Sequence, residues 1–116
     1  MSVRFDQYGG IGVVCIDGDL RGDDVASELR ETIAAAALAS STDRVRAFVV
    51  DLGRARFVDG RGLEALLWCK AQLGDEMAAF RLAGLDANCR KIFQMTRLDE
   101  RFELHPDVNA ALRAMN

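Results

Sequence analysis

The short run Asp59-Gly60-Arg61-Gly62-Leu63 holds the residues whose types and spacing are best suited to chemistry. It follows a buried apolar strand and begins a helix, and a helix N-terminus presents unpaired N–H groups and the positive end of the helix dipole. Arg61 lies between two glycines that leave the backbone accessible. The run therefore predicts a place where a phosphate or carboxylate of a ligand could bind.

Two residues of this segment have alternative interpretations. Asp59 is predicted to cap the helix by accepting a hydrogen bond from a backbone N–H of the first turn, although it could instead receive Arg61 or a basic residue of a partner. Trp68 lies on the same helix but off the apolar Leu63–Leu67 stripe. It either joins the core in part or, if exposed, serves as a binding anchor.

The charge pattern argues against nucleic acid as a partner. Arg54 and Arg56 are expected to edge the same surface as Arg61 and to give a local basic patch. The chain as a whole carries a net charge of −3, however, and no aromatic residues interleave with the arginines. Both features are atypical of nucleic-acid-binding proteins.

Nothing in the sequence predicts an enzyme, a metal site or a cofactor. The single histidine, His105, precedes the single proline, Pro106, and has no ligand or triad spacing around it, so we interpret it as a turn residue. The three cysteines have no CxxC spacing and lie in apolar periodic segments, which is typical of buried free thiols in a reducing cytosol; they are Cys15, Cys69 and Cys89.

The remaining elements follow from hydrophobic periodicity and turn residues. We expect four helices and five strands in the order ββαβαβαβα, an α/β domain with right-handed crossovers. The strands are Val3–Tyr8 and Ile11–Ile16, joined by a Gly9-Gly10 hairpin, then Val45–Leu52, Phe80–Leu85 and an edge strand Arg101–Leu104. The first helix begins near Asp23, carries Val25, Leu29, Ile33 and Ala37 on one face and ends before a Ser40–Asp43 loop. The second begins at the Asp59–Leu63 run. The third begins near Cys89 and includes Ile92, Phe93 and Met95, and the last begins at Pro106 and includes Val108, Leu112 and Met115.

The 116 residues are expected to fold as one domain over 1–116. The stretch from Met1 to Gln7 lacks the apolar run of a signal peptide, and the apolar run Ile33–Ala39 is too short to span a bilayer. We therefore expect a cytoplasmic protein that does not insert directly into a membrane.

Four segments in order resemble the STAS domain, which occurs in bacterial anti-sigma factor antagonists and in the cytosolic tails of sulphate transporters. They are VCIDGDL (Val14–Leu20), VVDLGRARFVDGRGL (Val49–Leu63), FRLAGLDANCRKIF (Phe80–Phe93) and MTRLDERFELHPDVNAAL (Met95–Leu112). The resemblance covers nearly the whole chain. It implies a mixed sheet of about five strands with four helices packed mainly on one face.

In the antagonist branch of that family, the signature turn reads Asp, Ser or Thr, Ser, Gly, Leu, and the second hydroxyl accepts phosphate from a partner kinase. Asp59, Gly62 and Leu63 match this pattern, whereas Gly60 replaces the first hydroxyl and Arg61 replaces the acceptor. No Ser, Thr or Tyr lies between Thr42 and Thr96. The resemblance therefore implies that no phosphorylation occurs at the family position.

Two other positions depart from the family pattern. Arg21 follows Leu20 where the family often carries an acidic residue near the phosphorylation site, and Arg97 replaces the usual glycine after Met95-Thr96. These changes concern regulation more than the fold.

The resemblance implies a non-enzymatic protein-interaction module, an antagonist that cannot be phosphorylated and stays competent to bind. Its partner would be an anti-sigma factor, a kinase-like protein or a transporter-associated protein, contacted through residues 59–68 together with Arg21 and Arg56. Two alternatives remain open, a nucleotide- or anion-sensing STAS domain and the small STAS subunit of a transport system. The sequence leaves the oligomeric state open between a monomer and a weak dimer.

Overall fold

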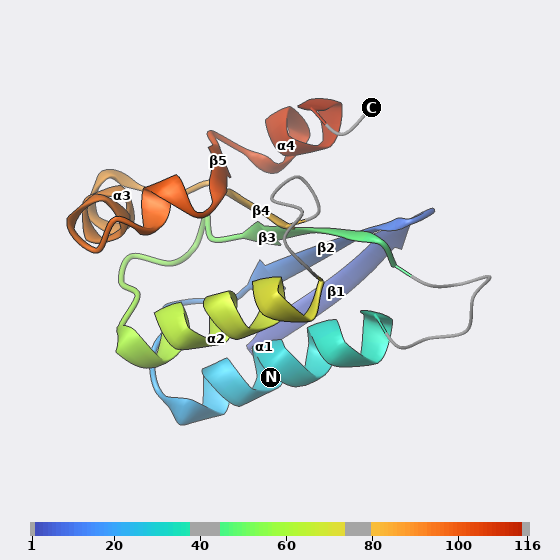
Figure 1. Ribbon diagram of the computed structural model, residues 1–116, viewed down its shortest axis with the longest axis horizontal. Helices are drawn as coiled ribbons and strands as arrows, with labels where there is room; N and C mark the ends of the chain where they lie inside the picture. Colours follow the sequence, from blue (N-terminus) through green and yellow to red (C-terminus); the bar gives the residue numbers. More distant parts are fainter. Residues whose placement is uncertain (1, 38–44, 74–79, 115–116) are drawn as a thin grey trace.

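The computed structural model describes residues 2–37, 45–73 and 80–114 and contains one five-stranded sheet with four α-helices (Figure 1). The predicted Ser40–Asp43 loop and Met115 lie outside these residues. The elements in chain order are β1 (Val3–Tyr8), β2 (Ile11–Ile16), α1 (Asp23–Ala37), β3 (Ala47–Asp51), α2 (Gly60–Gln72), β4 (Phe80–Ala83), α3 (Ala87–Met95), the 3₁₀ turn η2 (Leu98–Glu100), β5 (Glu103–His105) and α4 (Val108–Ala114).

The sheet order is β1-β2-β3-β4-β5, so each strand pairs with its neighbour in the sequence. The β1–β2 hairpin is antiparallel and the other three pairs are parallel. The predicted Gly9-Gly10 link is confirmed. Of its two glycines, Gly9 is the one with a positive φ, of 62°. The three central residues of β3 are buried, as expected for a strand covered on both faces; they are Phe48, Val49 and Val50.

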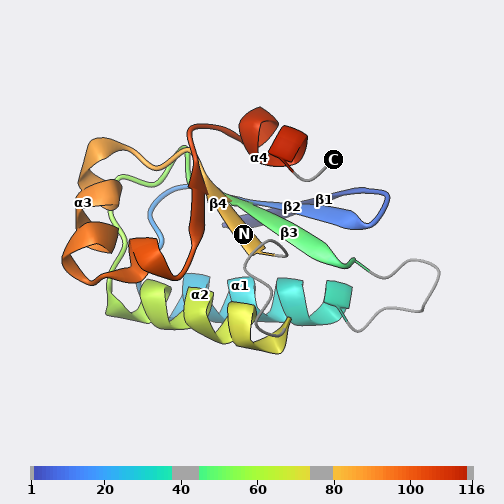
Figure 2. The same ribbon diagram turned by 45° about the horizontal axis from the view of Figure 1, so that its top comes forward.

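Helices cover both faces of the sheet (Figure 2). On α1, Ala26, Leu29 and Ile33 are buried at helical spacing, and with α2 this helix covers the main core on one face. On the opposite face, Ala111 of α4 packs in a smaller cluster with Val13, Val49 and Ala83. The parallel strands β2, β3 and β4 finish at the same end of the sheet, and α3 lies beside that end (Figures 1 and 2). The mixed five-stranded sheet with four helices confirms the expected fold class, although only α1 and α2 share a face and α4 packs on the opposite one.

Two predictions for the C-terminal segment were wrong. Pro106 does not open α4, because the side chain of Asp107 caps that helix by accepting from the N–H of Ala110 at 2.8 Å, and the helix begins at Val108. His105 is not a turn residue but the last residue of β5. The edge strand begins at Glu103, two residues after the predicted start at Arg101.

A polar cluster ties the edge strand β5 to β4. The Arg81 side chain is buried on β4, with Nη1 3.3 Å from Oε1 of Glu103 and 3.5 Å from Nε2 of His105. Nε2 of His105 also lies 3.1 Å from Oε1 of Glu103. Because a buried guanidinium must be paired, Arg81 holds the short strand β5 in register.

Candidate functional site

Asp59 joins the start of α2 to the loop between β2 and α1. Its Oδ1 accepts from the N–H of Gly62 at 2.9 Å, which caps α2, and its Oδ2 accepts from the N–H of Gly22 at 3.0 Å. These hydrogen bonds lower the pKa of Asp59 below its usual value of 3.8, and the bond from Gly62 has the larger effect. The predicted capping role is confirmed, and both carboxylate oxygens are engaged within the chain.

Gly62 allows the first turn of α2 to lie against Leu20. A Cβ atom at this position would be 2.4 Å from the carbonyl oxygen and 2.8 Å from Cγ of Leu20, which is completely buried. The same two segments share two backbone hydrogen bonds, from Leu20 N to Phe57 O at 3.1 Å and from Asp59 N to Leu20 O at 3.2 Å. Leu20, in the loop between β2 and α1, and the start of α2 are thus held together as one unit.

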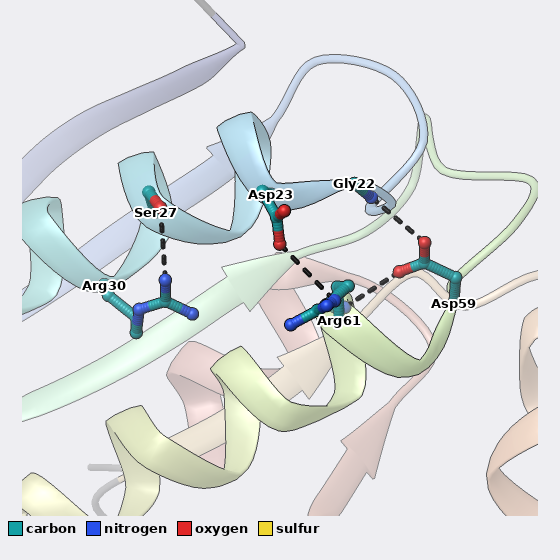
Figure 3. A network of polar contacts seen from close by, with 7 residues as sticks. Gly22, Asp23, Ser27, Arg30, Asp59 and Arg61 are labelled. Atoms are coloured by element: carbon teal, nitrogen blue, oxygen red, sulfur yellow. Dashed lines mark hydrogen bonds and ion pairs between the residues drawn. The ribbon is translucent and has the colours of Figure 1, made fainter.

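Arg61 projects from the first turn of α2 toward α1 (Figure 3). Its Nε lies 3.4 Å from Oδ1 of Asp23, and both side chains are mostly exposed, at 64% and 74%. The Arg61 side chain forms no ion pair with Asp59, which was one of the alternatives for that carboxylate, although the backbone N–H of Arg61 contributes to lowering the pKa of Asp59. An exposed pair of this kind stabilises the fold by about 1 kcal/mol at most, so Arg61 remains able to exchange Asp23 for another anionic group.

The predicted basic patch is balanced by carboxylates. Nη1 of Arg54 lies 2.8 Å from Oδ1 of Asp17, and this contact raises the pKa of Arg54. Arg61 faces Asp23 in the same way. The backbone N–H of Arg56 donates to Oδ1 of Asp19 at 2.9 Å while its side chain is exposed. The end of the molecule around α2 therefore presents alternating charges rather than a field of one sign.

Arg21 covers an aromatic residue that the sequence analysis did not single out. Its guanidinium carbon lies 5.9 Å from the ring centroid of Phe57, which is 42% exposed. Arg21 precedes Gly22, whose N–H binds Asp59, and its charge also contributes to the lowered pKa of that carboxyl. Phe57 lies in a loop between Arg56 and Val58, and no periodicity marks it as exposed.

Trp68 lies about 10 Å further along α2 than Arg61 and is 40% exposed. It lines a hollow of about 290 Å³ between α1 and α2, together with Ser27, Arg30, Glu31 and Ala34. The guanidinium of Arg30 donates to Oγ of Ser27 at 3.1 Å (Figure 3). Leu63 turns the other way and packs against the core.

We call the outer side of these two helices the α1–α2 surface. It consists of Asp23, Ser27, Arg30, Glu31, Arg61 and Trp68. It combines a large aromatic anchor with paired charges, a composition suited to binding another protein.

The residues present offer little for covalent chemistry. Burial raises the pKa values of the Cys69 and Cys89 thiols to about 12, so neither is a thiolate at neutral pH. In residues 2–37, 45–73 and 80–114, no group of three His, Cys, Asp or Glu side chains could hold a metal ion. Within the same residues, no helix has the length and apolar character needed to span a bilayer.

Comparison with known proteins agrees with this fold. The sequence matches the protein family described as Mlab, STAS domain, over residues 3–108. A search of the curated proteins finds no match. Among solved structures, an anti-sigma factor antagonist from Mycobacterium paratuberculosis has 27% identity and a TM-score of 0.80, with 97% of this chain and 92% of that chain covered.

Two further structures share the fold at lower identity. The anti-sigma factor antagonist SpoIIAA in its unphosphorylated form has 19% identity and a TM-score of 0.70, covering 97% of this chain and 96% of that one. The murine anion transporter Slc26a9 has 18% identity and a TM-score of 0.74, covering 95% of this chain but 18% of the transporter. Since the family match spans residues 3–108, this chain belongs to the STAS-domain family.

Proposed function

We propose that this protein is a non-enzymatic interaction module that binds its partner through the α1–α2 surface and cannot be switched off by phosphorylation at position 61. The observation that carries the proposal is the arginine in the first turn of α2, exposed and paired with Asp23. Two other residues of the turn keep the start of α2 in place, because Asp59 caps the helix and Gly62 lies against Leu20. The protein would act in the cytoplasm.

Charge explains why the arginine favours the bound state. A phosphoserine carries about −1.5 to −2 charges, so an arginine differs from a phosphorylated residue by roughly three charge units. An antagonist that is released by phosphate at this position would therefore be held in its binding state by Arg61. The side chain carries no hydroxyl, so a kinase has no acceptor there.

Anion sensing at the start of α2 receives less support. Oδ1 of Asp59 already accepts from the N–H of Gly62, one of the first-turn groups of α2 that a bound phosphate would use, while its Oδ2 accepts from the N–H of Gly22 before α1. A free anion would have to displace Asp59 or bind to the exposed side chain of Arg61 alone.

The class of partner follows from the relatives. Solved structures with this fold include anti-sigma factor antagonists and a transporter, and the matching family is described as Mlab, STAS domain. We therefore propose either a kinase-like anti-sigma factor or a transporter-associated protein, and the chain would then serve as an antagonist or as the small STAS subunit of a transport system.

Affinity measurements with each candidate partner test the surface. A candidate kinase-like anti-sigma factor and a candidate transporter-associated protein are each titrated with this chain by calorimetry. We expect Trp68→Ala to weaken binding by about thirtyfold and Arg61→Glu by at least about tenfold, because the first removes an aromatic anchor and the second reverses a charge.

The matched control is Arg113→Glu, which makes the same charge change on α4, on the opposite face of the sheet. It should leave the affinity unchanged. Equal affinities for the wild type, Trp68→Ala and Arg61→Glu would refute the proposed surface. Binding of ATP, GTP or phosphate with a melting shift beyond that of salt would instead support anion sensing.

A further inference from the structure

Two exposed apolar side chains lie on segments that meet at one end of the sheet. Phe57 stands in the loop between β3 and α2 and is 42% exposed, while Met95 is the last residue of α3 and is 75% exposed. The guanidinium carbon of Arg21 lies over the Phe57 ring, 5.9 Å from its centroid. Arginine, phenylalanine and methionine are residue types that are enriched in protein interfaces.

The loop that carries Phe57 is fixed against α3, and Figure 2 shows the two segments side by side. Nδ2 of Asn88, in the first turn of α3, donates to the carbonyl oxygen of Arg56 at 3.2 Å. Asn88, Lys91 and Met95 follow one another at spacings of three and four residues, so they share one side of the helix. This side of α3 therefore continues the surface that begins at Arg56.

Three cations of this surface have no carboxylate partner among the described residues. Arg21, Arg56 and Lys91 are exposed and form no ion pair within that part of the chain. Arg54 and Arg61 differ from them, because each pairs with an aspartate. The charges of Arg21, Arg56 and Lys91 are thus available to groups outside the chain.

The carboxylates next to this surface hold backbone groups. Oδ1 of Asp86 accepts from the N–H of Cys89 at 2.8 Å, which is the main cause of its lowered pKa, and the charge of Arg56 adds to that effect. Oδ1 of Asp19 accepts from the N–H of Arg56 at 2.9 Å. The two aspartates therefore position the start of α3 and the loop, and the guanidinium of Arg56 remains exposed.

We infer that Arg21, Arg56, Phe57, Lys91 and Met95 form a docking surface, the cationic band, for an acidic segment of a partner protein that also carries apolar side chains. Carboxylates of the segment pair with the three cations, and its apolar side chains pack on Phe57 and Met95. Because the chain as a whole has a net charge of −3, it repels such a segment elsewhere and directs it to the band. The cationic band is separate from the α1–α2 surface and gives the molecule a second contact area.

A protein segment fits these observations better than an anionic membrane does. The side chains of Asp19 and Asp86 lie beside the band, so a broad anionic surface would meet them together with the cations. A narrow segment instead follows Lys91 and Met95 along one side of α3. The negative charge of the rest of the chain also opposes a flat contact with anionic lipid.

Titration of the full chain with a synthetic peptide tests the binding chemistry. The probe is a peptide of five Glu-Glu-Leu repeats, and a peptide of five Gln-Gln-Leu repeats is the uncharged control. We expect the acidic peptide to bind with a micromolar dissociation constant at low salt and to shift the backbone NMR signals around Arg21, Phe57 and Lys91. Its affinity should fall at least about tenfold between about 50 mM and about 300 mM salt, because salt screens exposed charges. The glutamine peptide should bind at least about tenfold more weakly.

Charge reversal tests the residues of the band. Arg56→Glu combined with Lys91→Glu should weaken peptide binding at least about tenfold. The matched control, Arg46→Glu combined with Arg113→Glu, makes the same total change of charge before β3 and on α4, and should keep the affinity within about threefold. Trp68→Ala should also keep it, so the cationic band is tested independently of the partner proposed for the α1–α2 surface. Circular dichroism confirms that each variant is folded.

Four results would overturn the inference. They are equal binding of the two peptides, equal losses in the two double variants, NMR shifts confined to the α1–α2 surface, and no binding of the acidic peptide. In the last case, binding to phosphatidylcholine vesicles that contain phosphatidylglycerol, lost on reversal of Arg56 and Lys91, would assign the band to a membrane surface instead.

Discussion

Replacing Gly62 by alanine should separate α2 from the loop that precedes α1. The new Cβ would lie 2.4 Å from the carbonyl oxygen of Leu20, which is roughly 1 Å closer than the optimal separation of nonbonded heavy atoms. Movement of that size would stretch three hydrogen bonds beyond their normal range. They are Leu20 N to Phe57 O at 3.1 Å, Asp59 N to Leu20 O at 3.2 Å and Gly22 N to Asp59 Oδ2 at 3.0 Å.

The size of the effect follows from these contacts. Each hydrogen bond contributes about 0.5–1.5 kcal/mol net, and the higher helix propensity of alanine returns about 1 kcal/mol. We therefore expect Gly62→Ala to lower the free energy of unfolding by about 2 kcal/mol. Urea unfolding followed by circular dichroism measures it, and the melting temperature should fall by about 3–6 °C for each kcal/mol lost.

Gly60→Ala is the matched control two residues earlier. A Cβ at Gly60 meets no atom within 4 Å, so this variant should gain about 0.5–1 kcal/mol from helix propensity alone. The two variants should thus change stability in opposite directions. If Gly62→Ala were as stable as Gly60→Ala, the close approach to Leu20 would not matter and the reasoning would fail.

Three further predictions concern the same fold and site. Arg97 has a left-handed backbone with φ of 60°, so Arg97→Gly should raise the free energy of unfolding by up to about 1 kcal/mol in urea titrations; a loss of stability would contradict this. Asp59 has a lowered pKa in the folded protein. Its contribution to the free energy of unfolding is therefore present above its unfolded-state pKa and is lost as pH falls through its folded-state pKa. Unfolding measured between about pH 2 and 5 should therefore show a flatter acid limb for Asp59→Asn than for the wild type, and parallel limbs would count against the capping role. Because the Arg61–Asp23 pair is exposed, Arg61→Ala should change stability by less than about 1 kcal/mol; a larger loss would make Arg61 a structural residue.

The sequence was a good guide to features that depend on local chemistry. Apolar periodicity located the helices and the buried strand β3, and the Asp59 cap followed from its place before a helix. Glycines predicted the β1–β2 hairpin in the same way. Such features depend on residues within a few positions of one another, so the order of neighbouring side chains is enough to indicate them.

Contacts between distant segments were harder to predict. Nothing in the run around Arg61 indicates that Asp23 lies beside it, so a basic patch was expected where the structure has paired charges. Arg81 stands in an otherwise apolar strand, and its buried position makes sense only once β5 brings Glu103 alongside. Pro106 suggested a helix start, yet the capping side chain came from the next residue, Asp107.

The proposal that position 61 has lost its switch is tested most directly by intact-mass measurement of phosphate on this chain. The wild type and Arg61→Ser are each incubated with ATP and the cognate kinase-like protein. We expect no phosphate on the wild type, which should keep its affinity for the partner. We expect one phosphate on Arg61→Ser, with partner binding lost, since that variant restores the hydroxyl in an otherwise intact turn. Stoichiometric phosphate on the wild type, with release of the partner, would contradict the proposed function.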